Sequence, residues 1–314
     1  MSDTAKMVCV PSQAAQPRGR CHRPDQAPLR APAQHGTADV DMNLISKERE
    51  TLAQKRDSGA PSVNLEGVSV AFDVPGKGSM LAVDNIDLEV PAGQFVALVG
   101  PSGCGKTTAL NMLAGLMTPS AGTVSRYGKP VTGPSRDIGY MLARSALTPW
   151  RTVRKNVELG LEIRGIPAKE RKERSMNLLE ILKIDHFADA FPSQMSHGMQ
   201  QRVAIARTLA IDPDLWLMDE PFGALDAQTR VRVQTDFMRI WEGSGKTVLF
   251  VTHDLSEAVM MADRVIVMTQ RPAKIKLDMM VDVERPRNPQ EQLFDPRLEE
   301  IERTLWEELR HEFN

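Results

Sequence analysis

The chain has little of several features that would assign a protein to a class at once. Among its 314 residues there are 3 cysteines, and aromatic residues make up 5%. Three cysteines are too few for a disulfide framework, which favours a reducing cytoplasm. The formal net charge of −2 provides no basic field, so we expect no nucleic-acid partner. The sequence contains no run of about 18 apolar residues, so we do not expect it to cross a membrane by itself.

The beginning of the chain lacks aromatic side chains altogether. The first aromatic residue is Phe72, and six of the 21 prolines lie before Val63. Because so little apolar surface cannot offset the entropy of ordering, residues 1–62 are predicted to be a disordered tail. The first 16 residues have no apolar segment of a secretory signal. Met42 stays open as an alternative start of the chain.

A glycine-rich stretch at residues 100–107 fits the phosphate-binding pattern G-x-x-x-x-G-K-[S/T]. It follows the apolar run Phe95–Val99, which is typical of a strand buried on both faces, and it precedes a predicted helix over residues 108–116. In this order, backbone N–H groups and a helix N-terminus point at a polyphosphate. The sequence therefore predicts that the chain binds a nucleoside triphosphate.

Two side chains of this phosphate loop have predicted roles. Lys106 would reach the β- and γ-phosphates, and the hydroxyl of Thr107 would bind Mg²⁺. Cys104 is interpreted as a small side chain that points away from the phosphates, not as a nucleophile. The predicted cofactors are ATP and Mg²⁺. The residues expected to bind the nucleotide here are Gly100, Pro101, Ser102, Gly103, Cys104, Gly105, Lys106, Thr107 and Thr108.

Short apolar runs alternate with helical patterns in the rest of the chain. Residues 63–72 and 81–90 alternate in the manner of half-buried antiparallel strands. Apolar runs at 215–218, 248–251 and 265–268 predict a mostly parallel sheet in an α/β fold. About a hundred residues separate the phosphate loop from the first of these runs, more than a nucleotide-binding core requires. Helical patterns within them predict an inserted helical subdomain over about 144–210.

The last segment of the chain, residues 286–314, contains a predicted amphipathic helix. Asp295 is followed by Pro296, which is the usual order of an N-cap and a first helical position. Apolar residues then recur at spacings of three or four. We expect the helix to pack on its own domain rather than to lie on a membrane. The recurring residues are Leu298, Ile301, Leu305, Leu309 and Phe313.

Polar residues follow two of the predicted strands. Asp219 and Glu220 come directly after the run at 215–218, where Asp219 would bind Mg²⁺ and Glu220 would polarise an attacking water. His253 follows the run at 248–251, at the edge of the sheet where ligands bind in open α/β folds. We predict Glu220 and His253 as catalytic residues, and Thr107 and Asp219 as metal ligands.

Taken together, these residues resemble the ATP-binding subunit of ABC transporters over about residues 63–285. Residues 196–202 stand in the place of the family's signature motif, and Ala224-Leu225-Asp226 stands in the place of its D-loop. The resemblance implies a P-loop NTPase cassette with a mostly parallel core sheet, an N-terminal antiparallel β subdomain and a helical insertion. It also implies that Phe72 stacks on adenine, that Ser196, Gly198 and Asp226 bind nucleotide across a dimer, and that His253 is the switch histidine.

Two segments and one residue narrow the resemblance to the nitrate, sulfonate and taurine importers: residues 147–153, residues 284–287 and Met199. This likeness implies a subunit that binds and hydrolyses ATP to power uptake of a small anion. The implied partners are a second ATP-binding subunit, an integral membrane permease and, indirectly, a substrate-binding protein. The implied location is peripheral, on the cytoplasmic face of the inner membrane.

Two positions depart from the family's pattern. Ala143 stands where the family has a glutamine near Mg²⁺ and the attacking water, and His197 stands where its signature has a first glycine. These departures leave open a second interpretation, a weakly hydrolysing regulatory subunit paired with an active homologue. A soluble ABC ATPase of DNA repair or translation is disfavoured, because the sequence shows neither a long coiled-coil insertion nor a second cassette.

Overall fold

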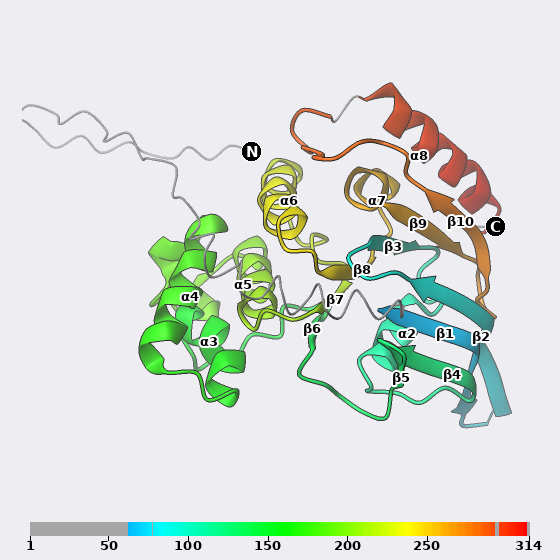
Figure 1. Ribbon diagram of the computed structural model, residues 1–314, viewed down its shortest axis with the longest axis horizontal. Helices are drawn as coiled ribbons and strands as arrows, with labels where there is room; N and C mark the ends of the chain where they lie inside the picture. The colour runs from blue at the N-terminus through cyan, green and yellow to red at the C-terminus, as the bar shows by residue number, and fades with distance from the viewer. Residues whose placement is uncertain (1–61, 77, 293–294, 313–314) are drawn as a thin grey trace, which may run out of the picture. The chain divides into compact units, whose positions relative to one another are not determined.

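The computed structural model of the chain describes residues 62–76, 78–292 and 295–312. The tail predicted over residues 1–62 therefore lies outside the described residues, except for Ser62. Within the described ranges, no helix combines the length and the apolar character that spanning a membrane requires. Two sheets and the helices around them make up this part of the chain (Figure 1).

The smaller sheet has four strands in the order β2-β1-β4-β5, and all of its pairings are antiparallel. Its first two strands form the predicted hairpin, and both extend further toward the turn than the alternation indicated. Neither β4 nor β5 was predicted, because β5 has two residues and β4 is largely exposed, so neither contains an apolar run. The strands are β1 (Val63–Val74), β2 (Gly78–Val90), β4 (Ala121–Arg126) and β5 (Lys129–Pro130).

The larger sheet has six strands in the order β10-β9-β3-β8-β7-β6. All pairings are parallel except that of β10 with β9, so the prediction of a mostly parallel core sheet is confirmed. Every residue of β3, β7 and β8 is buried, as expected for strands that are covered on both faces. The strands are β3 (Phe95–Val99), β6 (Ile138–Met141), β7 (Leu215–Asp219), β8 (Thr247–Val251), β9 (Arg264–Met268) and β10 (Ile275–Met280).

Side chains of β3 alternate between two hydrophobic cores, one on each face of the large sheet. Val96 and Leu98 belong to the core that also contains residues of the antiparallel sheet and of helix α2 (Lys106–Leu113). Phe95, Ala97 and Val99 belong to the core on the other face. That second core takes side chains from α6 (Ala227–Glu242), α7 (Leu255–Met261) and α8 (Pro296–Leu309).

Aromatic residues are scarce, yet six of them gather in the core beneath α6. Phe95 of β3 meets Trp241 at 5.1 Å, Phe250 at 5.5 Å and Phe237 at 6.2 Å between ring centroids, all edge to face. Such pairs contribute about 0.5–1.5 kcal/mol each beyond the burial of their area. The cluster therefore fixes α6 on the sheet next to the strands that end in Asp219 and at Val251. The six residues are Phe95, Trp216, Phe222, Phe237, Trp241 and Phe250.

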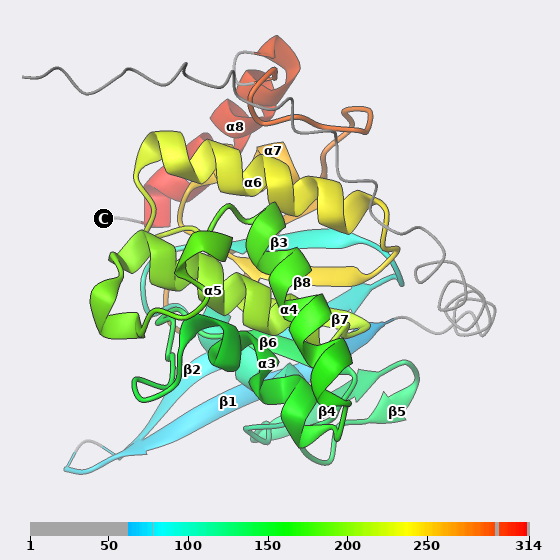
Figure 2. The same ribbon diagram turned by 90° about the vertical axis from the view of Figure 1, so that its left-hand side faces the viewer.

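The predicted helical insertion lies between β6 and β7 in the chain, and its three helices pack on one another (Figures 1 and 2). α3 begins at Val153, because the Thr152 hydroxyl accepts a hydrogen bond from Lys155 N as the N-cap. Short 3₁₀ turns connect α4 to α5. The elements are α3 (Val153–Ile163), α4 (Ala168–Ile181), η1 (Asp185–Phe187), η2 (Pro192–Gln194) and α5 (His197–Ala210).

The C-terminal helix α8 begins as predicted: Asp295 Oδ1 accepts a hydrogen bond from Arg297 N at 2.9 Å, and Pro296 is the first helical residue. Leu298, Leu305 and Leu309 are buried in the same core as α6 and α7. α8 therefore packs against the helices and strands that share this core. Phe313, the last residue of the predicted pattern, lies outside the described residues. A 3₁₀ turn, η3 (Arg310–Glu312), follows the helix.

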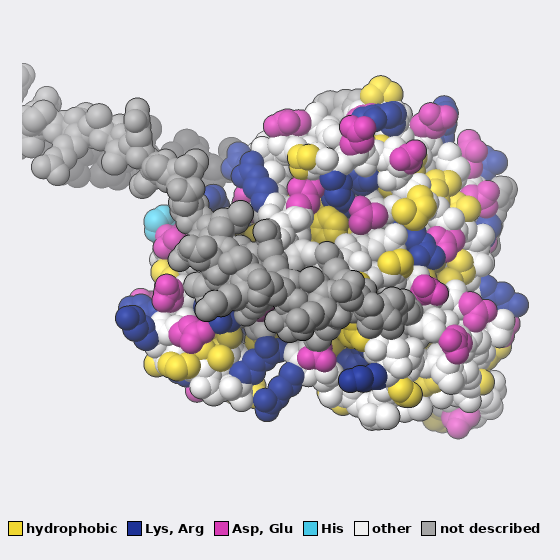
Figure 3. All heavy atoms as spheres, viewed as in Figure 1, with side chains coloured by type: hydrophobic (Ala, Val, Ile, Leu, Met, Phe, Trp, Pro, Cys, Tyr) yellow, Lys and Arg dark blue, Asp and Glu magenta, His cyan; other side chains and the backbone are white. Residues whose placement is uncertain are grey.

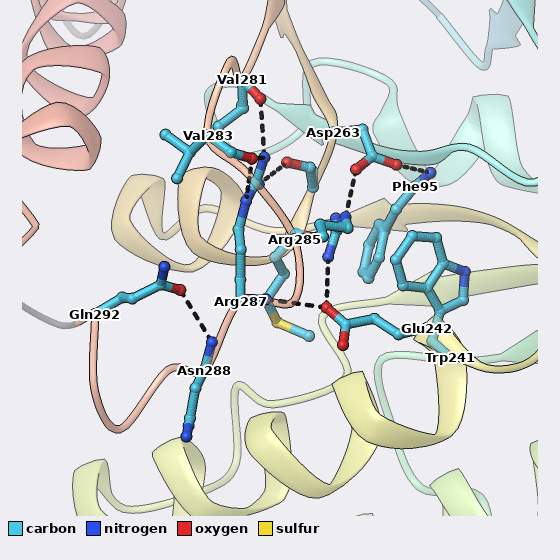
Figure 4. Close-up of polar contacts among 12 residues, drawn as sticks. Phe95, Trp241, Glu242, Asp263, Val281, Val283, Arg285, Arg287, Asn288 and Gln292 are labelled. Atoms are coloured by element: carbon cyan, nitrogen blue, oxygen red, sulfur yellow. Dashed lines mark hydrogen bonds and ion pairs between the residues drawn. The ribbon is translucent and has the colours of Figure 1, made fainter.

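Two arginines attach the segment after β10 to the helices (Figure 4). Arg287 is 3% exposed and donates to four backbone carbonyls. They belong to Val259 of α7, to Ala262, which is the C-cap of α7, and to Val281 and Val283. Burial lowers the pKa of Arg287 to about 10. Arg285 lies 4.4 Å over the Trp241 ring and binds Asp263 at 2.6 Å and Glu242 at 3.3 Å. Basic and acidic side chains are interspersed on the face shown in Figure 3.

Candidate nucleotide-binding and hydrolysis site

The phosphate loop connects β3 to α2 through two glycines that no other residue could replace easily. Gly100 has a φ of 156°, and a Cβ at this position would lie 2.7 Å from the carbonyl oxygen of Met268. Gly105 has a φ of 115° and is the N-cap of α2, where a Cβ would lie 2.9 Å from a methyl group of Val83. Both backbone conformations favour glycine. The loop can therefore turn sharply into the helix.

The side chain of Lys106 folds back across this loop. It is 7% exposed, and its ammonium group donates to the carbonyl oxygens of Gly100 at 2.7 Å and Pro101 at 2.9 Å. Lys106 is also the first residue of α2, where the helix dipole places a partial positive charge. A buried cation and a helix N-terminus thus converge on one loop, which is the arrangement that a polyphosphate needs.

Thr107 and Asp219 meet where a metal ion would be expected. The hydroxyl of Thr107 donates to Asp219 Oδ2 at 2.8 Å, across 112 residues of sequence. Asp219 is 5% exposed, and burial raises its pKa, while the hydrogen bond from Thr107 opposes that rise. A hydroxyl and a carboxylate are hard oxygen donors of the kind that Mg²⁺ takes, together with water and phosphate oxygens. The residues present therefore fit this ion.

Glu220 and His253 are brought together by the register of two neighbouring strands. Asp219 of β7 pairs with Val251 of β8, so the residues that follow both strands emerge at one edge of the sheet. His253 Nδ1 lies 3.3 Å from Glu220 Oε1, and both side chains are solvent-accessible, at 63% and 39%. The predicted catalytic pair is therefore in mutual contact.

The backbone at Glu220 adopts a left-handed conformation, with a φ of 47°. This is unfavourable for a residue with a side chain and persists only where its surroundings enforce it. Glu220 N donates to the carbonyl of Val251 at 2.9 Å, and the carbonyl of Glu220 accepts from Gly223 N at 3.2 Å. These bonds hold the turn that aims the carboxylate at His253.

The three signature and D-loop residues lie at helix starts. Ser196 caps α5, and its hydroxyl accepts from Met199 N at 3.3 Å. Asp226 caps α6 by accepting from Thr229 N at 3.0 Å, and this backbone hydrogen bond lowers its pKa. A Cβ on Gly198 would lie 3.2 Å from a methyl group of Leu225, so the two motifs touch. Their side-chain bonds go to the helices that they cap, and not to the phosphate loop.

The two residues that depart from the family's pattern are both exposed. His197 is the first residue of α5, and Ala143 lies just after β6. The segment after Ala143 is held by Arg207, which donates to the carbonyls of Ser145 and Ala146 at 2.8 Å each. The Ser145 hydroxyl lies 3.4 Å from Gln200 Oε1. The segment is therefore attached to α5, the helix that begins at the signature.

Phe72 lies on β1 opposite Met80 and is partly buried against the core of the antiparallel sheet. Its stacking on adenine stays a prediction.

Sequence reasoning missed a buried network behind His253. Glu257 accepts from Gln234 Nε2 at 2.8 Å and from the Thr252 hydroxyl at 2.5 Å. Burial raises the pKa of Glu257 to about 7, while the hydrogen bond from Thr252 opposes the rise. Gln201 was also missed; its amide donates to the carbonyl of Pro221 at 2.9 Å, next to Glu220. Their only sequence signal is a polar residue on the inner face of a helix.

Comparisons with known proteins identify relatives of this chain. An uncharacterised ABC transporter ATP-binding protein of Methanocaldococcus jannaschii is 48% identical over 241 residues, which cover 77% of this chain and 90% of that protein. The chain belongs to the ABC transporter family. The family model described as ABC transporter matches residues 83–223 of this ABC protein. Its domain is an ATPase domain that binds ATP.

A nitrate import ATP-binding protein of Synechocystis is 44% identical to this ABC ATPase over 216 residues, which cover 68% of this chain and 81% of that protein. A solved ATP-binding cassette, described as a dimeric post-hydrolysis state bound to ADP and Pi, superimposes with a TM-score of 0.65 at 32% identity. The match covers 71% of this chain and all of that one. The expected cassette fold is therefore confirmed.

Proposed function

We propose that this chain is the ATP-hydrolysing subunit of an importer for a small anion such as nitrate, a sulfonate or taurine. Its ATPase domain would span residues 63–285, with a helical subdomain at about 144–210. The observation that carries the proposal is the juxtaposition of two pairs at one sheet edge: Thr107 with Asp219, and Glu220 with His253. One pair suits a metal-bound polyphosphate, and the other suits the activation of water.

Each residue of the site has a role that its position supports. Lys106 neutralises charge on the β- and γ-phosphates once its ammonium exchanges the carbonyls of Gly100 and Pro101 for phosphate oxygens. Thr107 and Asp219 would hold Mg²⁺, which supplies charge neutralisation for the transferred phosphoryl group. Glu220 orients the attacking water and accepts its proton, and His253 keeps the carboxylate in place.

The signature side of the site is the start of α5, with Ser196 and His197. This side would come from a second ATP-binding subunit. The N-terminus of α5, with Ser196 as its cap, is exposed and would face the γ-phosphate held by the partner. Closure of such a pair on ATP would drive a membrane permease, with the chain bound peripherally on the cytoplasmic side. A substrate-binding protein would deliver the anion.

A second function, a weakly hydrolysing regulatory subunit, is favoured by Ala143 and His197 alone. Ala143 offers no polar atom beside the reaction, and His197 adds an imidazole where the family has glycine. The contact between Glu220 and His253 argues for turnover, because a subunit relieved of hydrolysis has no need for it.

Steady-state phosphate release by the purified chain, alone and with its permease, tests the proposal. Glu220→Gln should leave ATP binding intact and lower kcat by about 100-fold or more, since the amide cannot accept the proton. Turnover of the variant at the wild-type rate would refute the assigned role. The substrate class is tested by uptake of labelled nitrate and taurine through the complete transporter, with the Glu220→Gln complex as the control.

A further inference from the structure

The turn between β9 and β10 places an arginine against the phosphate loop. The guanidinium of Arg271 donates through Nε to the carbonyl oxygen of Gly103. A Cβ on Gly103 would lie 3.5 Å from Arg271 Nη2, so the guanidinium lies beside this glycine as well as bonding to it. The two residues are 168 positions apart in sequence.

This contact determines the direction of the peptide group between Gly103 and Cys104. In a trans peptide, the carbonyl and the next N–H point in opposite directions. With the Gly103 carbonyl turned toward Arg271, the N–H of Cys104 points to the inner side of the loop, where it donates to the carbonyl of Pro101 at 3.2 Å. That carbonyl also accepts from Lys106, the residue aimed at the phosphates. Arg271 thus orients one of the N–H donors that a phosphate loop uses.

The turn that carries Arg271 is itself held from two sides. On one side, Ala273 exchanges backbone hydrogen bonds with β2: its N–H donates to Ala82 at 2.9 Å, and its carbonyl accepts from Asp84 at 3.0 Å. On the other side, Glu312 in η3 accepts from Gln270 N at 3.0 Å and binds Lys276 Nζ at 3.0 Å. The C-terminal end of the chain therefore supports the turn that contacts the phosphate loop.

We propose that Arg271 is a positioning residue for the phosphate loop, and that Glu312 supports it from the C-terminal end of the chain. The inference rests on the proposed function of residues 100–107 as the ATP-binding loop. Arg271 acts through the Gly103 carbonyl, so its removal changes nucleotide affinity rather than the activation of water. The hydrogen bond, and not the charge, is the essential contribution.

The test uses the full chain, with Kd values for ATP and ADP and the KM and kcat of hydrolysis. Arg271→Ala should raise Kd and KM by about tenfold, close to the lower end of the range for one charge-assisted hydrogen bond, and change kcat by less than about twofold. Arg271→Lys and Arg271→Gln both retain a donor for the Gly103 carbonyl. Both should therefore restore Kd to within about threefold of the wild-type value.

The Gln variant separates positioning from charge. If Arg271→Lys restored affinity and Arg271→Gln bound ATP as weakly as Arg271→Ala, charge attraction would explain the effect and the proposal would be wrong. An unchanged Kd in Arg271→Ala would also overturn it. If instead the wild type failed to bind ATP, or Lys106→Ala bound as tightly as the wild type, the proposed function itself would fail.

The single variant Glu312→Ala tests the support role while Arg271 is still present. Glu312→Ala should raise Kd for ATP by about threefold, and adding it to Arg271→Ala should raise Kd no further, because both act through one contact. Glu307→Ala, which removes an exposed acid from the same end of α8, is the matched control. Additive effects of Glu312→Ala and Arg271→Ala would contradict the support role.

Discussion

The phosphate side and the signature side of the site are built in opposite ways. On the phosphate side, Lys106 and Asp219 are 7% and 5% exposed, and each is bonded to other parts of the site. On the signature side, Ser196 and His197 are exposed, and the bond of Ser196 stays within its own helix. One chain therefore organises the phosphate side by its own contacts and leaves the start of α5 exposed.

This difference indicates which property each side controls. A buried and fully bonded group is oriented before the ligand arrives, so the phosphate side should set the affinity of one chain for ATP. An exposed helix N-terminus gains most when a second surface brings charge to it and excludes water. The signature side should therefore affect turnover, which needs the assembled pair, and leave the affinity of a single chain unchanged.

The largest expected effect comes from Lys106→Ala. Removing the only buried cation that the described part of the loop directs at the phosphates should weaken ATP binding by about 100-fold or more. Titration with a fluorescent ATP analogue measures it, with circular dichroism as the check that α2 still forms. An affinity within a few-fold of wild type would break the assignment of the phosphate side.

Glu257→Gln tests whether the buried carboxyl group behind His253 makes the free energy of unfolding depend on pH. The folded-state pKa of about 7 exceeds the ordinary 4.5, so the folded chain retains a proton that the unfolded chain has lost between these pH values. Stability must therefore fall as pH rises through this window, by up to about 3 kcal/mol. The variant has no such proton to lose. Its free energy of unfolding should exceed that of wild type at pH 8 and match it more closely at pH 5.

Chemical denaturation at both pH values gives the two differences, with Glu307→Gln on the surface as the control. The same wild-type pH dependence in Glu257→Gln would show that other groups cause it.

The smallest expected effect concerns the two residues that depart from the family's pattern. Ala143→Gln combined with His197→Gly should raise turnover of the assembled transporter by up to about tenfold, which corresponds to about 1.4 kcal/mol. The glutamine would return a polar group near the reaction, and the glycine would let α5 approach the partner's phosphate. ATP affinity of the isolated chain should not change. Equal or lower turnover would mean that Ala143 and His197 have compensating neighbours.

The phosphate side of the site could largely be predicted from the sequence, because its residues follow strands that are continuous apolar runs. β3, β7 and β8 are continuous apolar runs, so their ends, and the side chains that follow, could be located from the sequence. β6 has four residues and β10 alternates with exposed positions, so neither has a distinctive pattern. Arg271 was missed because no local pattern reports a contact across 168 residues. Glu257 was missed because its partner Gln234 lies 23 residues away on another helix.

The most direct test of the account is to mix two inactive variants, Lys106→Ala and Ser196→Arg. If each site takes its phosphate side from one chain and its signature side from the other, every mixed dimer has one complete site. An equal mixture should then recover about a quarter of the wild-type ATPase activity, because about half of the dimers are mixed. Activity no higher than the average of the two variants measured separately would contradict the division of the site between two chains.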